Sequence, residues 1–221
     1  MLDLYDRLMS LFAPHSCLAC GLEPDLLCAT CRQDMSTVPP ACIVCGSLES
    51  GSLTCSSCKR VQKCDAVYVS YPYNKLAQQI VHTAKFNRAV AAHRLLAELL
   101  DETLPAHMPD FVVTNVPTVY RHVRQRGFDH TERIAKHLAE MRKLPFQRLL
   151  ERKSNLVQVG SARQDRLEQM KGAFRFAVKT TPSKVLIIDD VKTTGASLSE
   201  CARELKRAGV EHVYAAVFAK A

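Results

Sequence analysis

The stretch Lys184–Leu198, KVLIIDDVKTTGASL, decides the fold that we expect of this chain. Its four consecutive apolar residues, Val185–Ile188, do not alternate with polar ones, which is typical of a parallel strand covered on both faces. Two carboxylates, Asp189 and Asp190, follow directly, and a loop of small and hydroxyl-bearing residues then leads into a helix. The stretch therefore predicts a strand–loop–helix junction in a parallel sheet.

The chemistry of this junction predicts a phosphate site. The start of a helix presents free backbone N–H groups and the positive end of the helix dipole, and Gly195 permits a tight turn. The two carboxylates, about a sugar's width away, can accept hydrogen bonds from vicinal hydroxyls and help to hold Mg²⁺. A ribose 5-phosphate fits this pattern, whereas an ordinary Asp–Asp turn that caps a helix is the alternative. The phosphate ligands expected in the loop are Lys192, Thr193, Thr194, Gly195, Ala196 and Ser197.

Strands and helices alternate on both sides of this junction. The β-branched and aromatic runs predict strands at Asp65–Tyr73, Phe111–Val116 and His212–Ala219. Apolar residues at helical spacing predict helices at residues 2–12, Lys75–Phe86, Val90–Leu104, Thr131–Lys143 and Ala196–Ala208, the last closed by Gly209. We therefore expect an α/β fold with a mostly parallel sheet flanked by helices.

Eight of the ten cysteines form four CxxC pairs near the N-terminus, which favours metal binding. Each of two successive units has one pair followed by glycine and one without, so the segment reads as an internal repeat. Two residues between thiols aim both sulfurs at one metal, and four sulfurs leave no open position, so we expect two structural Zn²⁺ ions. The expected ligands are Cys17, Cys20, Cys28, Cys31, Cys42, Cys45, Cys55 and Cys58.

The repeat favours sequential pairing of these knuckles, but a crossed pairing fits the spacing as well. Redox-active CxxC pairs and a secreted disulfide framework are the other interpretations of so many cysteines, and four closely spaced pairs favour neither of them. We expect residues 1–60 to form a short helix with a zinc-ribbon module, and residues 61–221 to form the α/β domain.

The charge is unevenly distributed. The chain of 221 residues has 30 basic and 22 acidic side chains, and residues 1–60 hold only four of the basic ones and six of the acidic ones. Residues 121–175 hold 14 Lys and Arg against six Asp and Glu, which is typical of a surface that attracts phosphates, or simply of a solvated face. No run reaches the roughly 18 apolar residues of a membrane span, and the N-terminus lacks the basic start of a secretory signal. We therefore expect a cytoplasmic protein.

Residues 185–197 look like the phosphoribosyl pyrophosphate (PRPP) motif of type I phosphoribosyltransferases. The whole chain resembles the ComF family, in which a zinc-binding N-terminus precedes a phosphoribosyltransferase-like domain. Further motifs of that family match Thr83–Phe86, Val116-Pro117, Arg126–Phe128, Gln158, Arg166 and Gly172–Phe174. The family's usual RGFNQ is RGFDH here, with Asp129 and His130 in the last two positions.

The resemblance implies transfer of a ribosyl group from Mg²⁺-bound PRPP, with Asp189 and Asp190 in the catalytic role. The turn Val116-Pro117-Thr118 would face the pyrophosphate, and the segment from Arg152 to Arg166 would close over it. Basic residues implied to contact pyrophosphate or DNA are Arg121, Arg124, Arg126, Arg152, Lys153, Arg163 and Arg166.

Three functions stay open at this point. The chain could be an active phosphoribosyltransferase on a nucleobase or DNA acceptor. It could bind single-stranded DNA within a DNA-uptake machinery at the cytosolic face of the inner membrane, as the ComF resemblance implies. It could also be a regulator that binds PRPP without turnover.

Overall fold

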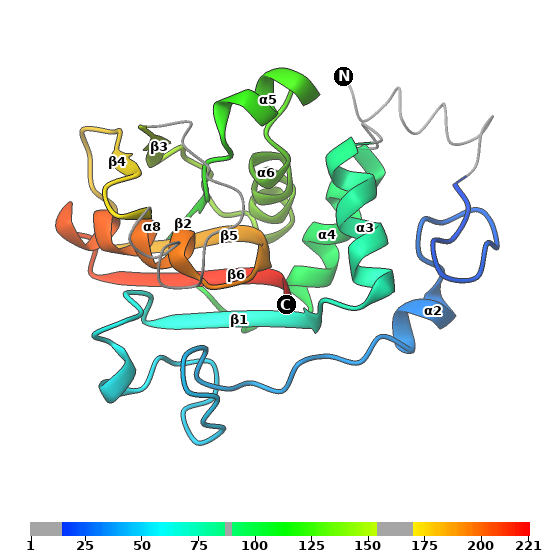
Figure 1. Cartoon of the computed structure of the whole chain (residues 1–221), viewed down its shortest axis with the longest axis horizontal. Helices are drawn as coiled ribbons and strands as arrows, with labels where there is room; N and C mark the ends of the chain where they lie inside the picture. The colour runs from blue at the N-terminus through cyan, green and yellow to red at the C-terminus, as the bar shows by residue number, and fades with distance from the viewer. Residues whose placement is uncertain (1–14, 87–89, 154–169) are drawn as a thin grey trace.

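The computed structural model describes residues 15–86, 90–153 and 170–221. Its centre is a four-stranded parallel sheet in the order β1–β6–β5–β2 (Figure 1). The strands of this sheet are β1 (Ala66–Pro72), β2 (Phe111–Asn115), β5 (Lys184–Lys192) and β6 (His212–Lys220). A separate antiparallel pair consists of β3 (Leu150–Arg152) and β4 (Phe174–Phe176). The helix expected at residues 2–12 lies outside the described residues.

Helices cover both faces of the central sheet, which explains why its inner strands are apolar without alternation. The helices are α3 (Lys75–Phe86), α4 (Val90–Asp101), α5 (Tyr120–Arg126), α6 (His130–Arg142) and α8 (Ala196–Arg207). Leu186 and Ile188 of β5 pack in one buried cluster with α3, α4 and α6. Val185 and Ile187 pack in a second cluster with α8 and the β3–β4 pair. The α/β fold with a parallel sheet and flanking helices is therefore confirmed.

Most helices end within a few residues of the expected positions, because capping residues mark their ends. Asp129 caps the start of α6, because its side chain accepts hydrogen bonds from the backbone N–H groups of Thr131 and Glu132. Gly209 has φ +98°, as expected for the residue that stops α8. No sequence pattern predicts α5 or the β3–β4 pair, and β5 continues to Lys192, beyond the strand expected at Val185–Ile188.

The cysteine-rich segment runs along β1, the edge strand of the sheet (Figure 1). Its short helices are α2 (Ala29–Gln33) and η1 (Ser56–Cys58). Arg32 forms ion pairs with Glu98 (3.1 Å) and Glu102 (2.7 Å) at the end of α4. The backbone N–H of Val38 donates to the carbonyl of Ser70 in β1 at 2.9 Å. The part of the segment between its two cysteine groups is thus bound to α4 by ion pairs and to β1 by a backbone hydrogen bond.

Among the described residues, no helix has the length and apolar character needed to cross a membrane.

Candidate functional site

The end of β5 carries both acidic residues inside the strand. β5 keeps its parallel pairing with β6 beyond Ile188 as far as Lys192. Successive side chains of a strand point to opposite faces, so Asp189 and Asp190 are directed to different sides of the sheet. The two carboxylates therefore have different surroundings, which the sequence analysis did not foresee.

Asp190 is buried against α3 and α6. Its Oδ2 forms an ion pair with the Lys85 ammonium group and lies 3.1 Å from His130 Nε2. Its Oδ1 accepts a hydrogen bond from the backbone N–H of Val191 at 2.8 Å. Burial alone would raise the pKa of Asp190, but the hydrogen bond from His130 and the charge of Lys85 outweigh burial and hold the pKa below its usual range. Asp190 is therefore an ionised and fully partnered carboxylate.

Asp189 lies on the face of the sheet that α8 covers. Ile187, two residues earlier on the same face, packs with Leu198 and Cys201 of α8. Burial, followed by the negative charge of Asp190, raises the pKa of Asp189 well above its ordinary value. Burial also raises the pKa of the Cys201 thiol, and the charge of Asp189 adds to that rise. The Asp189 carboxyl can thus donate as well as accept a hydrogen bond.

The loop after β5 has the geometry of an anion-binding turn. Gly195 has φ +76° and precedes α8 directly. Ala196 donates its backbone N–H to Thr194 Oγ1 at 3.3 Å. Within the described part of the chain, no hydrogen bond is formed by the backbone N–H groups of Gly195, Ser197 and Leu198. These amides are available to an anion at the positive end of the α8 dipole.

Lys192 is packed across this turn rather than extended into solvent. It is 8% exposed, and a Cβ added to Gly195 would lie 3.0 Å from the Lys192 Cε. Gly195 therefore both allows the positive φ and leaves space for the aliphatic part of the Lys192 side chain.

The second wall of the site is the turn Val116-Pro117-Thr118 after β2. The backbone N–H of Val116 donates to the carbonyl of Ile188 at 3.0 Å, so the turn lies beside β5. Asp129 holds Thr118, accepting from its backbone N–H at 3.0 Å and from its Oγ1 at 2.8 Å. The helix cap of α6 thereby fixes the turn, a role for Asp129 that sequence reasoning missed.

The structure distributes the expected basic residues over three places. Arg121 and Arg124 are exposed on α5, while Arg126, at its end, lies over the Phe86 ring at 4.8 Å. Arg152 lies over the Phe174 ring at 5.3 Å, and Lys153 next to it is exposed. The remaining residues expected in the closing loop, Gln158, Arg163 and Arg166, lie outside the described residues.

Sequence reasoning also missed Lys85 as a partner of the acidic pair. A signal was present, because Lys85 follows Ala77 and Val81 at a spacing of four along the buried stripe of α3. A charged side chain on such a stripe calls for a buried partner, which here is Asp190.

The cysteines form two groups in sequential pairing, so a crossed pairing is excluded for this structure. In each group the four sulfur atoms lie within 4.8 Å of one another; the groups are Cys17, Cys20, Cys28, Cys31 and Cys42, Cys45, Cys55, Cys58. The sulfurs of Cys20 and Cys28 are 3.7 Å apart, as are those of Cys45 and Cys55. Four sulfurs placed tetrahedrally at about 2.3 Å from Zn²⁺ are about 3.8 Å apart, so both groups fit structural zinc.

The backbone around each group favours a thiolate at one of its four cysteines, Cys17 in the first group and Cys42 in the second. Gly21 and Gly46 have φ +78° and +77°, as the glycines after the knuckles predict. Burial alone would raise the pKa of the Cys17 thiol, but backbone N–H groups of Cys20 and Cys28 lower it to about 6. Burial would likewise raise the pKa of the Cys42 thiol, but backbone N–H groups of Cys45 and Cys55 lower it to about 6. Thiolates are the form that binds metal.

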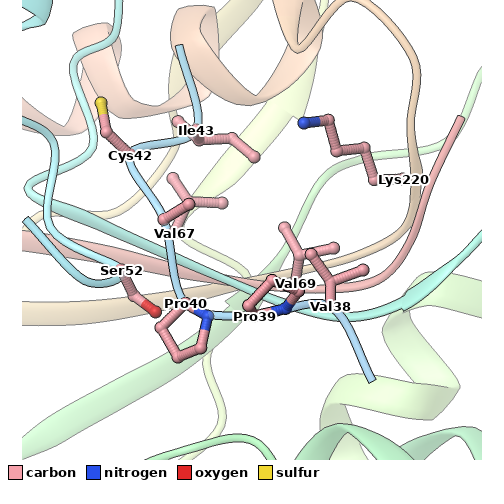
Figure 2. A pocket seen from close by; sticks show the side chains of 10 residues that line it. Val38, Pro39, Pro40, Cys42, Ile43, Ser52, Val67, Val69 and Lys220 are labelled. Carbon is pink, nitrogen blue, oxygen red and sulfur yellow. The ribbon is translucent and has the colours of Figure 1, made fainter. Parts of the chain in front are cut away.

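Two hollows lie away from the loop between β5 and α8. Figure 2 shows the smaller one, where the segment Val38–Ile43 passes over Val67 and Val69 of β1. Its volume of about 30 Å³ suits a single water molecule rather than a ligand. The larger one, about 700 Å³ and open, lies between the end of α4 and the start of β2, at the amino edge of the sheet.

The resemblance to the ComF proteins is confirmed by relatives that match most of the chain, although no family model matches it. "Competence protein F" of Haemophilus influenzae is 27% identical over 203 residues, which cover 85% of this chain and 87% of that protein. "DNA utilization protein YhgH" of Salmonella typhi is 28% identical and covers 92% of this chain and 96% of its own. "Competence protein ComFC" of Streptococcus pneumoniae is 27% identical, with 86% of each chain covered.

Two solved structures are also similar. One is described as the allosteric regulatory enzyme of purine biosynthesis, with a TM-score of 0.43 and 17% identity. The other is glutamine PRPP amidotransferase from B. subtilis, with a TM-score of 0.43 and 16% identity. In both cases the match covers 62% of this chain and 30% of the other.

Proposed function

We propose that this chain is a PRPP-binding, phosphoribosyltransferase-like protein of the ComF type that handles incoming DNA in the cytoplasm. The observation that carries the proposal is the β5–α8 junction, where Asp189 near the end of β5 is followed by a glycine turn and by helix amides that have no hydrogen-bond partner among the described residues. The 5-phosphate of PRPP would occupy the turn, and the ribose hydroxyls would meet Asp189. Relatives named for competence and DNA utilization support the biological context.

The geometry suits positioning and charge neutralisation more than covalent catalysis. Displacement of pyrophosphate from C1 of the ribose builds positive charge on the sugar and negative charge on the leaving group. Val116-Pro117-Thr118 would line the pyrophosphate side. Mg²⁺ binds carboxylate oxygens while it keeps several waters, and Asp189 would supply such an oxygen on losing its proton. When bound, the metal would neutralise the departing pyrophosphate.

Calorimetric titration with PRPP and Mg²⁺ tests the binding site. We expect saturable binding by the wild type and loss of most of it in Asp189→Ala/Asp190→Ala. Glu211→Ala, which removes an exposed carboxylate just before β6, is the matched control and should bind as the wild type does. Equal affinity in all three proteins would place PRPP elsewhere, and no binding by the wild type would refute the proposal.

Pyrophosphate release separates an enzyme from a regulator. The wild type would be incubated with PRPP, Mg²⁺ and either nucleobases or single-stranded DNA as acceptor. Release that depends on the acceptor and is lost in Asp189→Ala/Asp190→Ala would identify a phosphoribosyltransferase. Tight PRPP binding without release under any of these conditions would identify the regulator.

The exposed face of α5 supports single-stranded DNA as a second ligand. Arg121 and Arg124 are exposed there, and Tyr120 beside them is 61% exposed. Cationic and aromatic side chains together are what single strands bind, through phosphate contacts and base stacking. Arg121→Ala/Arg124→Ala should weaken binding and reduce the slope of log affinity against log salt by about 1.4. Lys179→Ala, an exposed lysine before β5, is the control that should change neither.

We also propose that residues 1–60 form a zinc-stapled module and residues 61–221 the phosphoribosyltransferase-like domain. Zinc thiolates without disulfides are typical of a reducing compartment, which agrees with the proposed cytoplasmic location. The ten cysteines are all free thiols in the structure.

A further inference from the structure

A closed ring of side chains joins four elements at the carboxyl end of β5. Asp190 Oδ2 meets Lys85 of α3 and His130 Nε2 of α6. The other ring nitrogen of His130, Nδ1, lies 3.3 Å from Nη1 of Arg126 at the end of α5. The guanidinium of Arg126 lies over the ring of Phe86, the neighbour of Lys85 on α3. The chain of contacts thus begins and ends on α3, at Lys85 and Phe86.

The two contacts of His130 select one form of its imidazole. Arginine has N–H donors and no acceptor, so Nδ1 facing Arg126 must be the nitrogen without a proton. Nε2 then carries the hydrogen and donates it to the Asp190 carboxylate, which only accepts. A doubly protonated imidazole would place an N–H against the N–H of Arg126. The neighbours of His130 therefore favour a hydrogen on Nε2 and none on Nδ1.

This arrangement leaves Asp190 little freedom. The Asp190 side chain is 9% exposed and the His130 side chain 6% exposed, so solvent does not compete for their hydrogen bond. Lys85 and His130 hold Oδ2 from two helices, and Oδ1 accepts from the next backbone N–H in the strand. The carboxylate is thereby fixed two residues before Lys192, which packs across the Gly195 turn.

We propose that His130 is a positioning residue that donates its Nε2 hydrogen to Asp190, holds it beside Lys85 and so fixes the end of β5 from which the proposed phosphate loop departs. Its effect on PRPP rests on the proposed function, whereas the state of its ring does not. Under the proposed function, Asp189, on the other face, is the acidic residue that would meet the ligand.

The form of the ring is tested on the protein without PRPP. Nitrogen-15 spectra of histidine-labelled protein distinguish protonated from unprotonated ring nitrogens, and the signal missing from His130→Gln belongs to His130. His212→Ala, an exposed histidine at the start of β6, removes a different signal and serves as the control. We expect a hydrogen on Nε2 and none on Nδ1. A hydrogen on Nδ1 overturns the proposal.

PRPP binding is tested with two variants of His130 whose side-chain nitrogens lie at different distances from Cβ. The nitrogen of Gln, like His Nε2, is three bonds from Cβ, whereas that of Asn is two bonds away and corresponds to Nδ1. His130→Gln can therefore still donate to Asp190 and should bind PRPP nearly as the wild type does. His130→Asn cannot reach and should bind about tenfold more weakly, the effect of losing a hydrogen bond to a charged group. Thermal unfolding of both variants establishes that they are folded.

The outcomes are distinct. Equal affinity of the wild type and both variants, or equal weakening by Gln and Asn, would overturn the positioning role. If the wild type binds no PRPP, the proposed function fails, and the nitrogen-15 spectra alone decide the proposal for His130.

Discussion

Gly195→Ala is the most informative single change in the loop between β5 and α8, where we propose that phosphate binds. Gly195 has φ +76°, a conformation that costs an L-residue about 1–2 kcal/mol. The added Cβ would also lie 3.0 Å from the Lys192 Cε, so the lysine stem must move. We therefore expect a moderate loss of stability together with a displaced loop that binds PRPP poorly.

Gly209→Ala provides a matched control for the strain alone. Gly209 has φ +98° at the other end of α8, and its added Cβ would meet only a Thr181 methyl carbon at 3.9 Å. For a chain of this size, 1 kcal/mol corresponds to about 2–4 °C in the melting temperature. Both variants should therefore lose about 2–8 °C, measured by thermal unfolding at one protein concentration.

Only Gly195→Ala should weaken PRPP binding, measured by calorimetry with Mg²⁺. We expect a loss of at least about tenfold, because the amides that face the phosphate depend on the turn for their direction. Gly209→Ala should bind as the wild type does. Unchanged affinity in Gly195→Ala at the expected loss of stability would refute the assignment of this turn as the phosphate site.

Two further predictions follow from the cysteine groups and from a buried histidine. Purified protein should contain two Zn²⁺ ions per chain by elemental analysis. Cys17→Ser/Cys28→Ser changes only the first group and should keep one ion, whereas Cys17→Ser/Cys42→Ser changes both groups and should keep none. No ion in the first variant and one ion in the second would indicate crossed pairing. Burial, followed by the charge of Arg133, lowers the pKa of His93 to about 4. As the pH falls below about 6.5, His93 therefore binds a proton in the unfolded chain before it does so in the folded protein. The free energy of unfolding should therefore fall by up to roughly 3 kcal/mol between pH 6.5 and 4, and His93→Leu should reduce this slope; an identical slope in both proteins would exclude His93 as its source.

The sequence predicted the parallel sheet and the metal groups because both depend on local patterns. An apolar run without alternation identifies a strand buried on both faces, and CxxC spacing with a following glycine identifies a knuckle. The boundaries of α3 were predicted to the residue, since its apolar stripe is regular. In contrast, α5 has no buried residue at all, so no periodic signal marked it. The strands β3 and β4 have three residues each, too few to show a period.

The surroundings of the acidic pair depended on tertiary contacts that no local pattern reveals. The apolar run by itself predicts a buried strand only at Val185–Ile188, where two adjacent carboxylates follow it. The strand does continue, since Lys85 and His130 neutralise and hydrogen-bond Asp190 from helices 105 and 60 positions away in sequence. Alternation along that longer strand then separates Asp189 from Asp190, which a turn would have left side by side.

The first cysteine group and the acidic pair are connected through the packing of α3. Cys17 and Leu27 belong to the same buried cluster as Ile80 and Ala84, the residues that seat α3 on the body. Lys85, next in sequence to Ala84, is the ion-pair partner of Asp190. The cysteine-rich segment has little core of its own, so the free energy of zinc binding also contributes to the folding of the cluster that it shares with α3. Zinc in this group would therefore stabilise the cluster on which α3 packs, although no cysteine of the group lies between β5 and α8.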